Sequence, residues 1–447
     1  MKSKIVTGFL CTILLMTAPS VQAAEFIDNQ VVDSNKTWIV KFNSEVALEN
    51  LTRDAITVTD SKGTKVNIGV QQGEDKKVVK VTAPEEGYLS GEKYVLKIGN
   101  NIYSTTGKAL KNEYKLDFSV GDKDKTLNKD LKTKIKSGNL ATDYSIEQAL
   151  SDIDKFQLNT LNIPVVIRID NLSSSAMTVD KYSEEKAINL IKELKDKNIN
   201  IILEPYPWIN DGDDPETNWS PDNINTFFWN WKTTVLKSLI DNIANPYNVD
   251  AINIGSSFNN LEYAEGYWCD TIDYVRERYD GLVTYRTGWW YTAEGYQSKL
   301  NNRMFSKLDF ISIAAYFELT DKSSGKDTNT VEDLVKAIES TQNPNRKQKI
   351  KEEIKGLHDK WDKQIFFGEL GFPRINKASA EPWNPDENNI INDVEQANCF
   401  EAYRREFENE PWFLGFSVFS IGETSADKRY YPSEQSTSVI KNWYNKN

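Results

Sequence analysis

Residues 162–205 read NIPVVIRID (162–170), then, after a short polar stretch, SEEKAINLIKELKDK (183–197) and NINIILEP (198–205). The first and last runs are short, apolar and rich in β-branched residues, whereas the middle run places Leu190, Ile191 and Leu194 on one face of a helix. Strand, helix and strand in this order, with nearly continuous apolar strands, are typical of a parallel sheet buried on both faces. This stretch therefore predicts an α/β fold.

The same alternation continues towards the end of the chain. The later strand-like runs are VDAINIGSS (249–257), LVTYRTG (282–288), LDFISIAAY (308–316), QIFFGELGF (364–372) and LGFSVFSI (414–421). SGNLATDYS (137–145), just before the helical run IEQALSDIDKF, supplies an eighth strand. Eight strands over about 300 residues favour a (β/α)₈ TIM barrel over residues 137–447. An open doubly wound sheet is the alternative, although no glycine-rich nucleotide-binding fingerprint supports it.

The preceding segment, residues 24–120, has a different pattern. Its strand-like runs are TWIVKF (37–42), AITVTD (55–60), VVKVTA (78–83), KYVLKI (93–98) and YKLDFSV (114–120), which predict an all-β antiparallel sandwich. The sequence of this segment resembles those of the bacterial Ig-like domains of surface-layer and secreted proteins. The resemblance implies a spacer module. Residues 121–136 are charged and contain no aromatic residue, so we expect a linker there.

Residues 1–23 have the pattern of a cleaved secretory signal, because Lys2 and Lys4 precede an apolar stretch and a small-residue site at Val21-x-Ala23. A retained signal anchor is the alternative. We expect a secreted or cell-surface protein of Gram-positive type, with no membrane span after signal cleavage.

The net charge of −12 argues against a nucleic-acid partner. His358 is the single histidine, which excludes a histidine-rich metal site. We expect a monomer without metal or cofactor.

In a TIM barrel the carboxyl ends of the strands form the site, so the informative residues are those at which each apolar run stops. These residues are mostly carboxylates and aromatics, with arginines and serines among them: Arg168, Asp170, Glu204, Tyr206, Trp208, Ser256, Ser257, Arg286, Trp289, Trp290, Tyr316, Glu318, Glu369, Ser420 and Glu423. Aromatic faces stack on sugar rings while carboxylates accept hydrogen bonds from sugar hydroxyls. A polysaccharide or cell-wall glycan is therefore the expected partner.

Glu369 is the most informative of these residues. It directly follows an aromatic strand, and Gly368 and Gly371 leave room around it. A carboxylate in such a dry position needs a partner, and we expect Arg168 or Tyr316 to lie near it. A purely structural ion pair is the alternative.

Several segments resemble glycoside hydrolase family 113, a clan-A (β/α)₈ family with β-mannanase members. They are FFGELGFPRINKASAEPWNP (366–385), VEQANCFEAY (394–403), PWFLGFSVFSIGE (411–423) and INIGSSFNNLE (252–262). The resemblance implies that Glu369 matches the catalytic nucleophile, that Tyr316 matches the tyrosine beside it, and that Arg168 occupies the place of a nearby arginine.

Retaining hydrolysis needs a second carboxylate that protonates the leaving oxygen and later activates water. In the family that glutamate ends the fourth strand, in a motif I-G-x-E, whereas this chain reads Ile254-Gly255-Ser256-Ser257. Ser257 thus stands at the acid/base position, and a serine hydroxyl is a poor proton donor at neutral pH.

Two hypotheses follow from this departure. In the first, a retaining β-glycoside hydrolase uses a substitute acid, for which Glu262, Glu204 and Glu318 are the candidates. In the second, the barrel binds a glycan at the cell surface without cleaving it. In both, the expected substrate-binding residues are Arg168, Trp208, Arg286, Trp289, Trp290, Tyr316 and Phe419, the last of which stands near the place of the clan's sugar-stacking tryptophan.

Overall fold

The computed structural model describes residues 30–32, 34–47, 54–85, 87–89, 91–120, 127, 131–194, 197–324, 326–341, 347–424 and 428–444. The expected signal segment, residues 1–23, lies outside these ranges. The chain divides into two compact units, which are described separately. In the described part of the chain, no helix combines the length and the apolar character that a membrane crossing requires.

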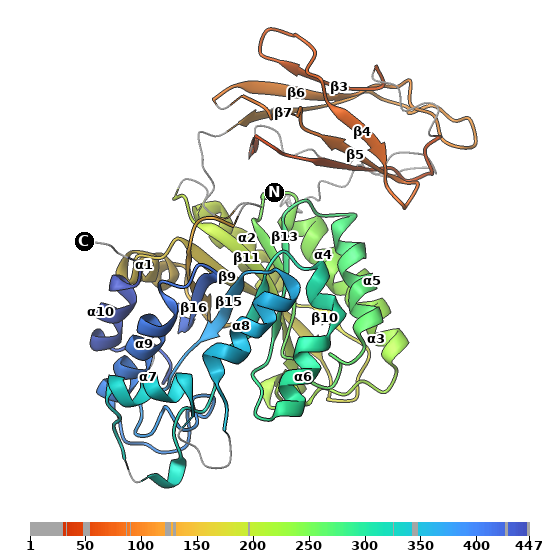
Figure 1. The fold of residues 1–447 in the computed structure, drawn as a ribbon. Coiled ribbons are helices and arrows are strands. Elements are labelled where there is room, and N and C mark those ends of the chain that lie inside the picture. The colour runs from red at the N-terminus through yellow and green to blue at the C-terminus, as the bar shows by residue number, and fades with distance from the viewer. Residues whose placement is uncertain are drawn as a thin grey trace, which may run out of the picture. The chain divides into compact units, whose positions relative to one another are not determined.

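The first unit is an antiparallel sandwich with one parallel strand pair at an edge (Figure 1). One sheet has the order β1-β7-β6-β3, with β1 at Gln30–Val32, β7 at Tyr114–Val120, β6 at Lys93–Ile98 and β3 at Ile56–Asp60. The second has the order β2-β5-β4, with β2 at Trp38–Lys41, β5 at Val78–Thr82 and β4 at Gly69–Gln72. The five strands predicted from the sequence are confirmed, and β1 and β4 are additional.

Alternating side chains explain why these segments pair into a sandwich. Along β2 and β6 every second residue is buried, and Trp38 packs against Phe118 with ring centroids 4.9 Å apart. The buried side chains of the two sheets form one apolar cluster, as expected for strands with one face inward.

Eight parallel strands close a barrel in the second unit, which confirms the predicted (β/α)₈ fold (Figure 1). They are β8 (Ile135–Leu140), β9 (Thr160–Ile169), β11 (Asn200–Ile209), β12 (Ala251–Ser256), β13 (Leu282–Thr287), β14 (Ile311–Ala314), β15 (Ile365–Leu370) and β16 (Phe413–Ile421). The barrel closes because β8 pairs in parallel with both β16 and β9. A two-residue strand, β10 (Thr178–Val179), pairs antiparallel with β9.

Helices alternate with the strands along the chain. They are α1 (Ile146–Phe156), α2 (Lys181–Leu194), α3 (Ile224–Asn230), α4 (Lys237–Leu239), α5 (Glu265–Arg276), α6 (Ala293–Asn301), α7 (Val331–Glu339), α8 (Ile350–Trp361), α9 (Asp393–Phe407) and α10 (Glu434–Asn442). Shorter 3₁₀ and π segments are η2 (Asn210–Gly212), η3 (Glu216–Asn218), η4 (Trp231–Leu236), η5 (Ile240–Ala244), η6 (Arg303–Lys307) and η7 (Lys322–Ser324).

Local chemistry sets the ends and faces of these helices. Ser145 caps α1 by accepting a hydrogen bond from the Gln148 N–H at 3.1 Å. In α2, Leu190, Ile191 and Leu194 are all buried, as the sequence pattern predicted.

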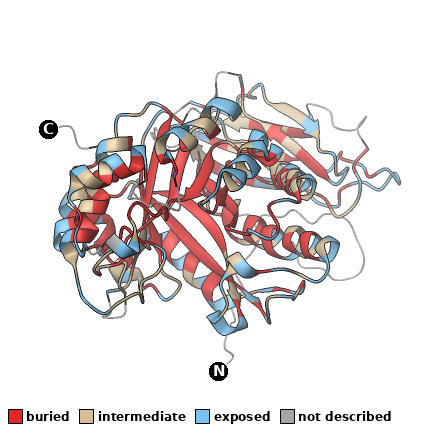
Figure 2. Ribbon diagram, turned by 60° about the horizontal axis from the view of Figure 1, so that its bottom comes forward, coloured by how far each residue is buried: buried red, intermediate tan, exposed pale blue. Residues whose placement is uncertain are grey.

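The barrel strands are buried almost throughout (Figure 2). An apolar layer closes the end of the barrel at which the strands begin, and it contains Leu127, Leu131, Ile135, Ile202, Ala251, Leu282, Phe310, Phe366 and Leu414. The expected linker, residues 121–136, is therefore too long: β8 already begins at Ile135, and Leu127 and Leu131 are buried in this layer. Burying Leu127 and Leu131 removes apolar surface from water, which stabilises their packing in this layer.

Candidate active site

Glu369 lies on β15, one residue before the strand ends, and its side chain is 15% exposed. The preceding Gly368 has a steric role, because a Cβ there would lie 2.0 Å from Ser312 Oγ and 2.8 Å from Arg286 Cδ. Glycine thus leaves room for the Arg286 side chain to pass under β15. Gly368, expected from the sequence to leave room around Glu369, therefore makes room for Arg286.

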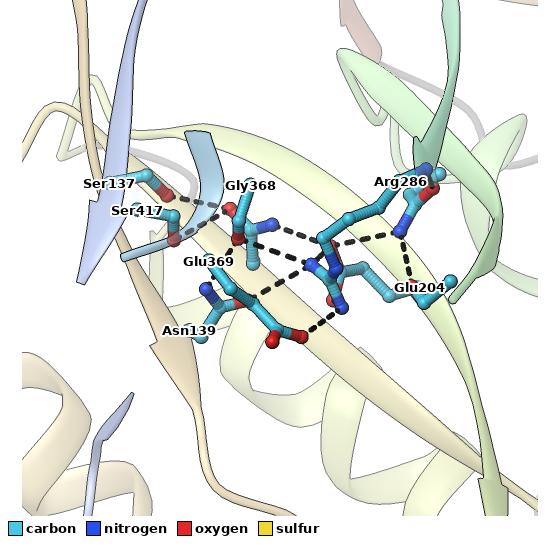
Figure 3. A network of polar contacts seen from close by, with 10 residues as sticks. Ser137, Asn139, Glu204, Arg286, Gly368, Glu369 and Ser417 are labelled. Atoms are coloured by element: carbon cyan, nitrogen blue, oxygen red, sulfur yellow. Dashed lines mark hydrogen bonds and ion pairs between the residues drawn. The ribbon is translucent and has the colours of Figure 1, made fainter. Parts of the chain in front are cut away.

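Arg286, on β13, is the central charge of the site (Figure 3). Its Nη1 and Nη2 donate to the two carboxylate oxygens of Glu204 at 2.7 and 3.1 Å, and Nη2 also lies 2.8 Å from Glu369 Oε1. The Arg286 side chain is 3% exposed. One positive charge is therefore shared between the buried Glu204 carboxylate, from β11, and the largely buried Glu369 carboxylate, from β15.

Polar side chains from other strands complete this network (Figure 3). Asn139 Nδ2 donates to the Gly368 carbonyl at 2.6 Å, and Asn162 Nδ2 donates to Glu204 Oε1 at 2.5 Å. The Oδ1 of Asn253, which lies in the run INIGSSF, accepts the backbone N–H of Arg286 at 3.1 Å. Buried polar groups need such partners, so the upper barrel interior is a hydrogen-bonded layer above the apolar one.

Arg286 and Tyr316 offset part of the effect that burial has on the pKa of Glu369. Burial is the main cause that raises its pKa, and the charge of Glu204 raises it as well. The charge of Arg286 and a hydrogen bond from the Tyr316 hydroxyl lower it, but the pKa of Glu369 stays above its ordinary value. Arg286 and Tyr316 thus favour the carboxylate form of Glu369.

Aromatic side chains lie beside Glu369. The Tyr316 ring is 5.3 Å from that of Trp289, 6.0 Å from that of Phe419 and 6.3 Å from that of Tyr430, measured between centroids. Trp289 and Phe419 are each partly exposed. These rings offer flat apolar faces next to the carboxylate, as a sugar ring requires.

Ser257 follows the last residue of β12 and is buried. Its φ of 51° lies in the left-handed region, and its N–H donates to the Arg286 carbonyl at 2.8 Å. The N–H of the next residue, Phe258, donates to the Tyr285 hydroxyl at 3.2 Å. The backbone therefore turns away from the strand at Ser257, and the end of β12 carries no carboxyl group.

The sequence of residues 132–439 matches the model of Glycoside Hydrolase Family 113. The chain belongs to this family. Residues 16–120 match the model of a bacterial Ig-like domain.

Solved structures of other family 113 proteins have the same fold. A complex of a family 113 β-1,4-mannanase has 19% sequence identity and a TM-score of 0.55, with 70% of this chain and 98% of that chain covered. The family 113 β-mannanase from Alicyclobacillus acidocaldarius, in complex with ManMIm, has 16% identity and a TM-score of 0.55, with 69% and 96% covered. Comparison with curated protein sequences gave no match.

Two residues expected to bind substrate in this family 113 chain lie elsewhere. Arg168 is half exposed and pairs with Asp180 at 2.8 Å, so it is not the arginine beside Glu369; Arg286 is. Trp290 is 2% exposed, donates from Nε1 to Glu353 at 2.6 Å and packs on Phe317. Trp289, in contrast, is partly exposed and lies beside Tyr316, so the two tryptophans have different surroundings.

Two of the expected substitute acids are already engaged. Both oxygens of Glu204 bind Arg286. Glu262 is 5% exposed and accepts hydrogen bonds from Lys299, from Tyr285 at 3.1 Å and from Thr287 at 3.0 Å. A carboxylate held by cations and hydroxyl donors is a poor proton donor, so these contacts argue against Glu204 and Glu262 as the acid.

The remaining predicted residues lie at the carboxyl ends of their strands. Glu318 is 6% exposed and accepts a hydrogen bond from Trp383 Nε1 at 3.2 Å; its role as an acid stays a prediction. Trp208 is partly exposed, lies 6.5 Å from Tyr206 between ring centroids, and packs against Gly212.

Sequence reasoning missed Glu216 and Tyr430. Glu216 lies in η3, in the loop that follows β11, and burial with the charge of Glu369 raises its pKa to about 7. The signal that could have found it is its place after a barrel strand, since these loops form the site face. Within the described ranges, no group of His, Cys, Asp or Glu side chains is arranged to hold a metal ion.

Proposed function

We propose that this chain is a secreted retaining hydrolase of β-linked polysaccharide, with Glu369 as the nucleophile. The observation that carries the proposal is the pair of contacts that Arg286 and Tyr316 make with the Glu369 carboxyl at the end of β15, since both contacts favour its charged form. A nucleophilic carboxylate must be charged and fixed in orientation, and an arginine with a tyrosine hydroxyl does both.

The substrate class follows from the aromatic surroundings and from family membership. Trp289, Tyr316 and Phe419 lie next to one another beside the carboxylate. Because related structures are described as β-1,4-mannanases, β-mannan is the first polysaccharide to test. The signal-like pattern of residues 1–23 supports action outside the cytoplasm.

Ser257 favours a second candidate function, a glycan-binding protein without turnover. Loss of a general acid costs about 10²–10⁴-fold in rate, and an unactivated sugar leaving group depends most on that acid. In this alternative the Glu369 network persists because an unpaired buried Arg286 would destabilise the barrel.

A comparison of wild type with Glu369→Ala separates the two functions. The substrates are β-mannan and aryl β-glycosides of manno-oligosaccharides, and the measurement is their hydrolysis. We expect wild type to release product whose first-formed anomer is β, as proton NMR would show, and Glu369→Ala to lose several powers of ten in rate. An α anomer formed first would refute retention. If wild type cleaves no substrate but binds β-glycans as tightly as Glu369→Ala does, the hydrolase proposal is wrong and the binding function stands.

A further inference from the structure

A retaining hydrolase needs a group that protonates the leaving oxygen. The end of β12 carries Ser257, and both oxygens of Glu204 are bound by Arg286. Glu262 is surrounded by Lys299, Tyr285 and Thr287. A proton donor for the site must therefore come from another element.

The loop after β11 is anchored beside the end of β12. Trp219, the residue that follows η3, is fully buried and lies 5.5 Å from Phe258 and 4.9 Å from Phe227 between ring centroids. Its Nε1 donates to the Ser174 carbonyl at 3.0 Å. The backbone N–H of Trp219 donates to the Glu216 carbonyl at 3.1 Å. Because Phe258 is the neighbour of Ser257, the contact of Trp219 with Phe258 holds the end of the η3 turn near the position that lacks a carboxyl group.

The other end of the loop is held as well. Gly212 packs directly against the indole of Trp208, where even a Cβ would lie 2.5 Å from the ring. Ile209 and Asp214 form an isolated antiparallel bridge. Contacts at both ends therefore fix the loop that carries Glu216.

Glu216 is partly exposed, and within the described ranges it forms no ion pair. Its charge interacts with those of Glu369 and Arg286 and acts on the hydroxyls of Tyr206 and Tyr285. Tyr285 is the residue whose hydroxyl accepts the Phe258 N–H. Glu216 thus lies within electrostatic reach of Glu369 and of a group beside Ser257.

We propose that Glu216 is the general acid and base of this site, in place of the carboxyl group that Ser257 lacks. The inference rests on the proposed hydrolase function. In the first step a Glu369 oxygen bonds to the anomeric carbon, the glycosidic C–O bond breaks, and the leaving oxygen takes the Glu216 proton. In the second step water attacks the anomeric carbon, Glu216 takes a water proton, and the Glu369 ester bond breaks.

The surrounding charges suit both steps. Burial raises the pKa of Glu216 to about 7, and the charge of Glu369 is the next cause, while Arg286 opposes it. Glu216 therefore holds its proton while Glu369 is charged. Once Glu369 is esterified its charge is gone, so the pKa of Glu216 falls and the carboxylate can accept a proton from water.

The test compares Glu216→Gln and Glu216→Ala with Asp213→Asn, a matched control that removes an exposed carboxylate of the same loop. Substrates are a manno-oligosaccharide and aryl glycosides with phenols of increasing acidity. We expect Glu216→Gln to lose about 10²–10⁴-fold on the oligosaccharide and far less on the most acidic phenol, which leaves without a proton. Azide should accelerate Glu216→Ala and yield the β-glycosyl azide, because azide attacks without help from a base.

The outcomes separate this inference from the proposed function. If wild type hydrolyses the oligosaccharide and Glu216→Gln equals Asp213→Asn on every substrate, Glu216 is not the proton donor, while the hydrolase function stands. Equal losses on all leaving groups, without azide product, would also overturn the inference, because they indicate a structural role. If wild type is inert even on the most acidic phenol, the proposed function itself fails. Thermal unfolding of both Glu216 variants checks that they fold.

Discussion

Replacing Arg286 with methionine tests the central charge network, because it keeps most of the side-chain length and removes the charge shared by Glu204 and Glu369. The side chains are 3% exposed for Arg286, 6% for Glu204 and 15% for Glu369. Removing one partner of a buried ion pair costs about 3–5 kcal/mol, whereas an exposed pair contributes at most about 1 kcal/mol. We therefore expect Arg286→Met to lower the free energy of unfolding by about 3–5 kcal/mol.

The loss should depend on pH. Burial raises the pKa of Glu369 and the Arg286 charge opposes it, so the pKa rises further in Arg286→Met. A carboxyl whose folded pKa lies above the unfolded value of about 4.3 stabilises the fold below that pH, and this stability is lost as pH rises through the folded pKa. The difference between wild type and Arg286→Met should therefore be small near pH 4 and grow towards pH 7.

Urea unfolding followed by tryptophan fluorescence at these two pH values measures the effect. Arg168→Met is the matched control, since Arg168 is 54% exposed and pairs with Asp180. Adding Glu204→Gln to Arg286→Met should recover part of the loss, because it removes one of the carboxylates left without a partner. If Arg286→Met costs no more than Arg168→Met, or costs the same at both pH values, the argument from a buried charge network is refuted.

The remaining predictions concern the mouth of the barrel. Tyr316→Phe removes a hydrogen bond to a charged carboxylate and should lower kcat about 10- to 100-fold with KM nearly unchanged, as steady-state kinetics would show; an unchanged kcat would contradict the contact. Trp289→Ala should weaken glycan binding in calorimetry with little loss of stability. Trp290→Ala should lower the free energy of unfolding by about 3–5 kcal/mol in urea unfolding. The reverse result would show that Trp290 binds glycan and Trp289 packs in the core. Hydrolysis of an unactivated substrate should fall as pH rises through about 7, where Glu216 loses its proton, and Glu216→Gln should lack this limb of the pH profile. Gly368→Ala should lower the unfolding midpoint by an amount that corresponds to about 1–3 kcal/mol, because its Cβ would meet Ser312 and Arg286; a neutral effect would mean that these side chains move aside.

Much of the fold followed from local patterns. The eight barrel strands and the antiparallel sandwich were predicted because the spacing of apolar residues is a property of short segments. The strands missed in the sandwich, β1 and β4, are short, and Gly69–Gln72 carries two glutamines instead of an alternating apolar pattern. The segment 121–136 was misjudged because two leucines among many charges do not reveal which surface they cover.

The sequence by itself determined that Glu369 would end a barrel strand among aromatic residues, and that Ser257 would end another strand without a carboxyl group. Both follow from where an apolar run stops. Only the tertiary structure decided the partners: Arg286 and not Arg168 meets Glu369, Trp290 enters the core, and the loop that carries Glu216 is anchored on Phe258 after β12. The physical reason is that the direction of a side chain at a strand end depends on barrel closure and register. The position of a loop carboxylate depends in turn on contacts with residues distant in sequence, such as that of Trp219 with Phe258. Local sequence patterns predict neither the direction of these side chains nor the position of the loop.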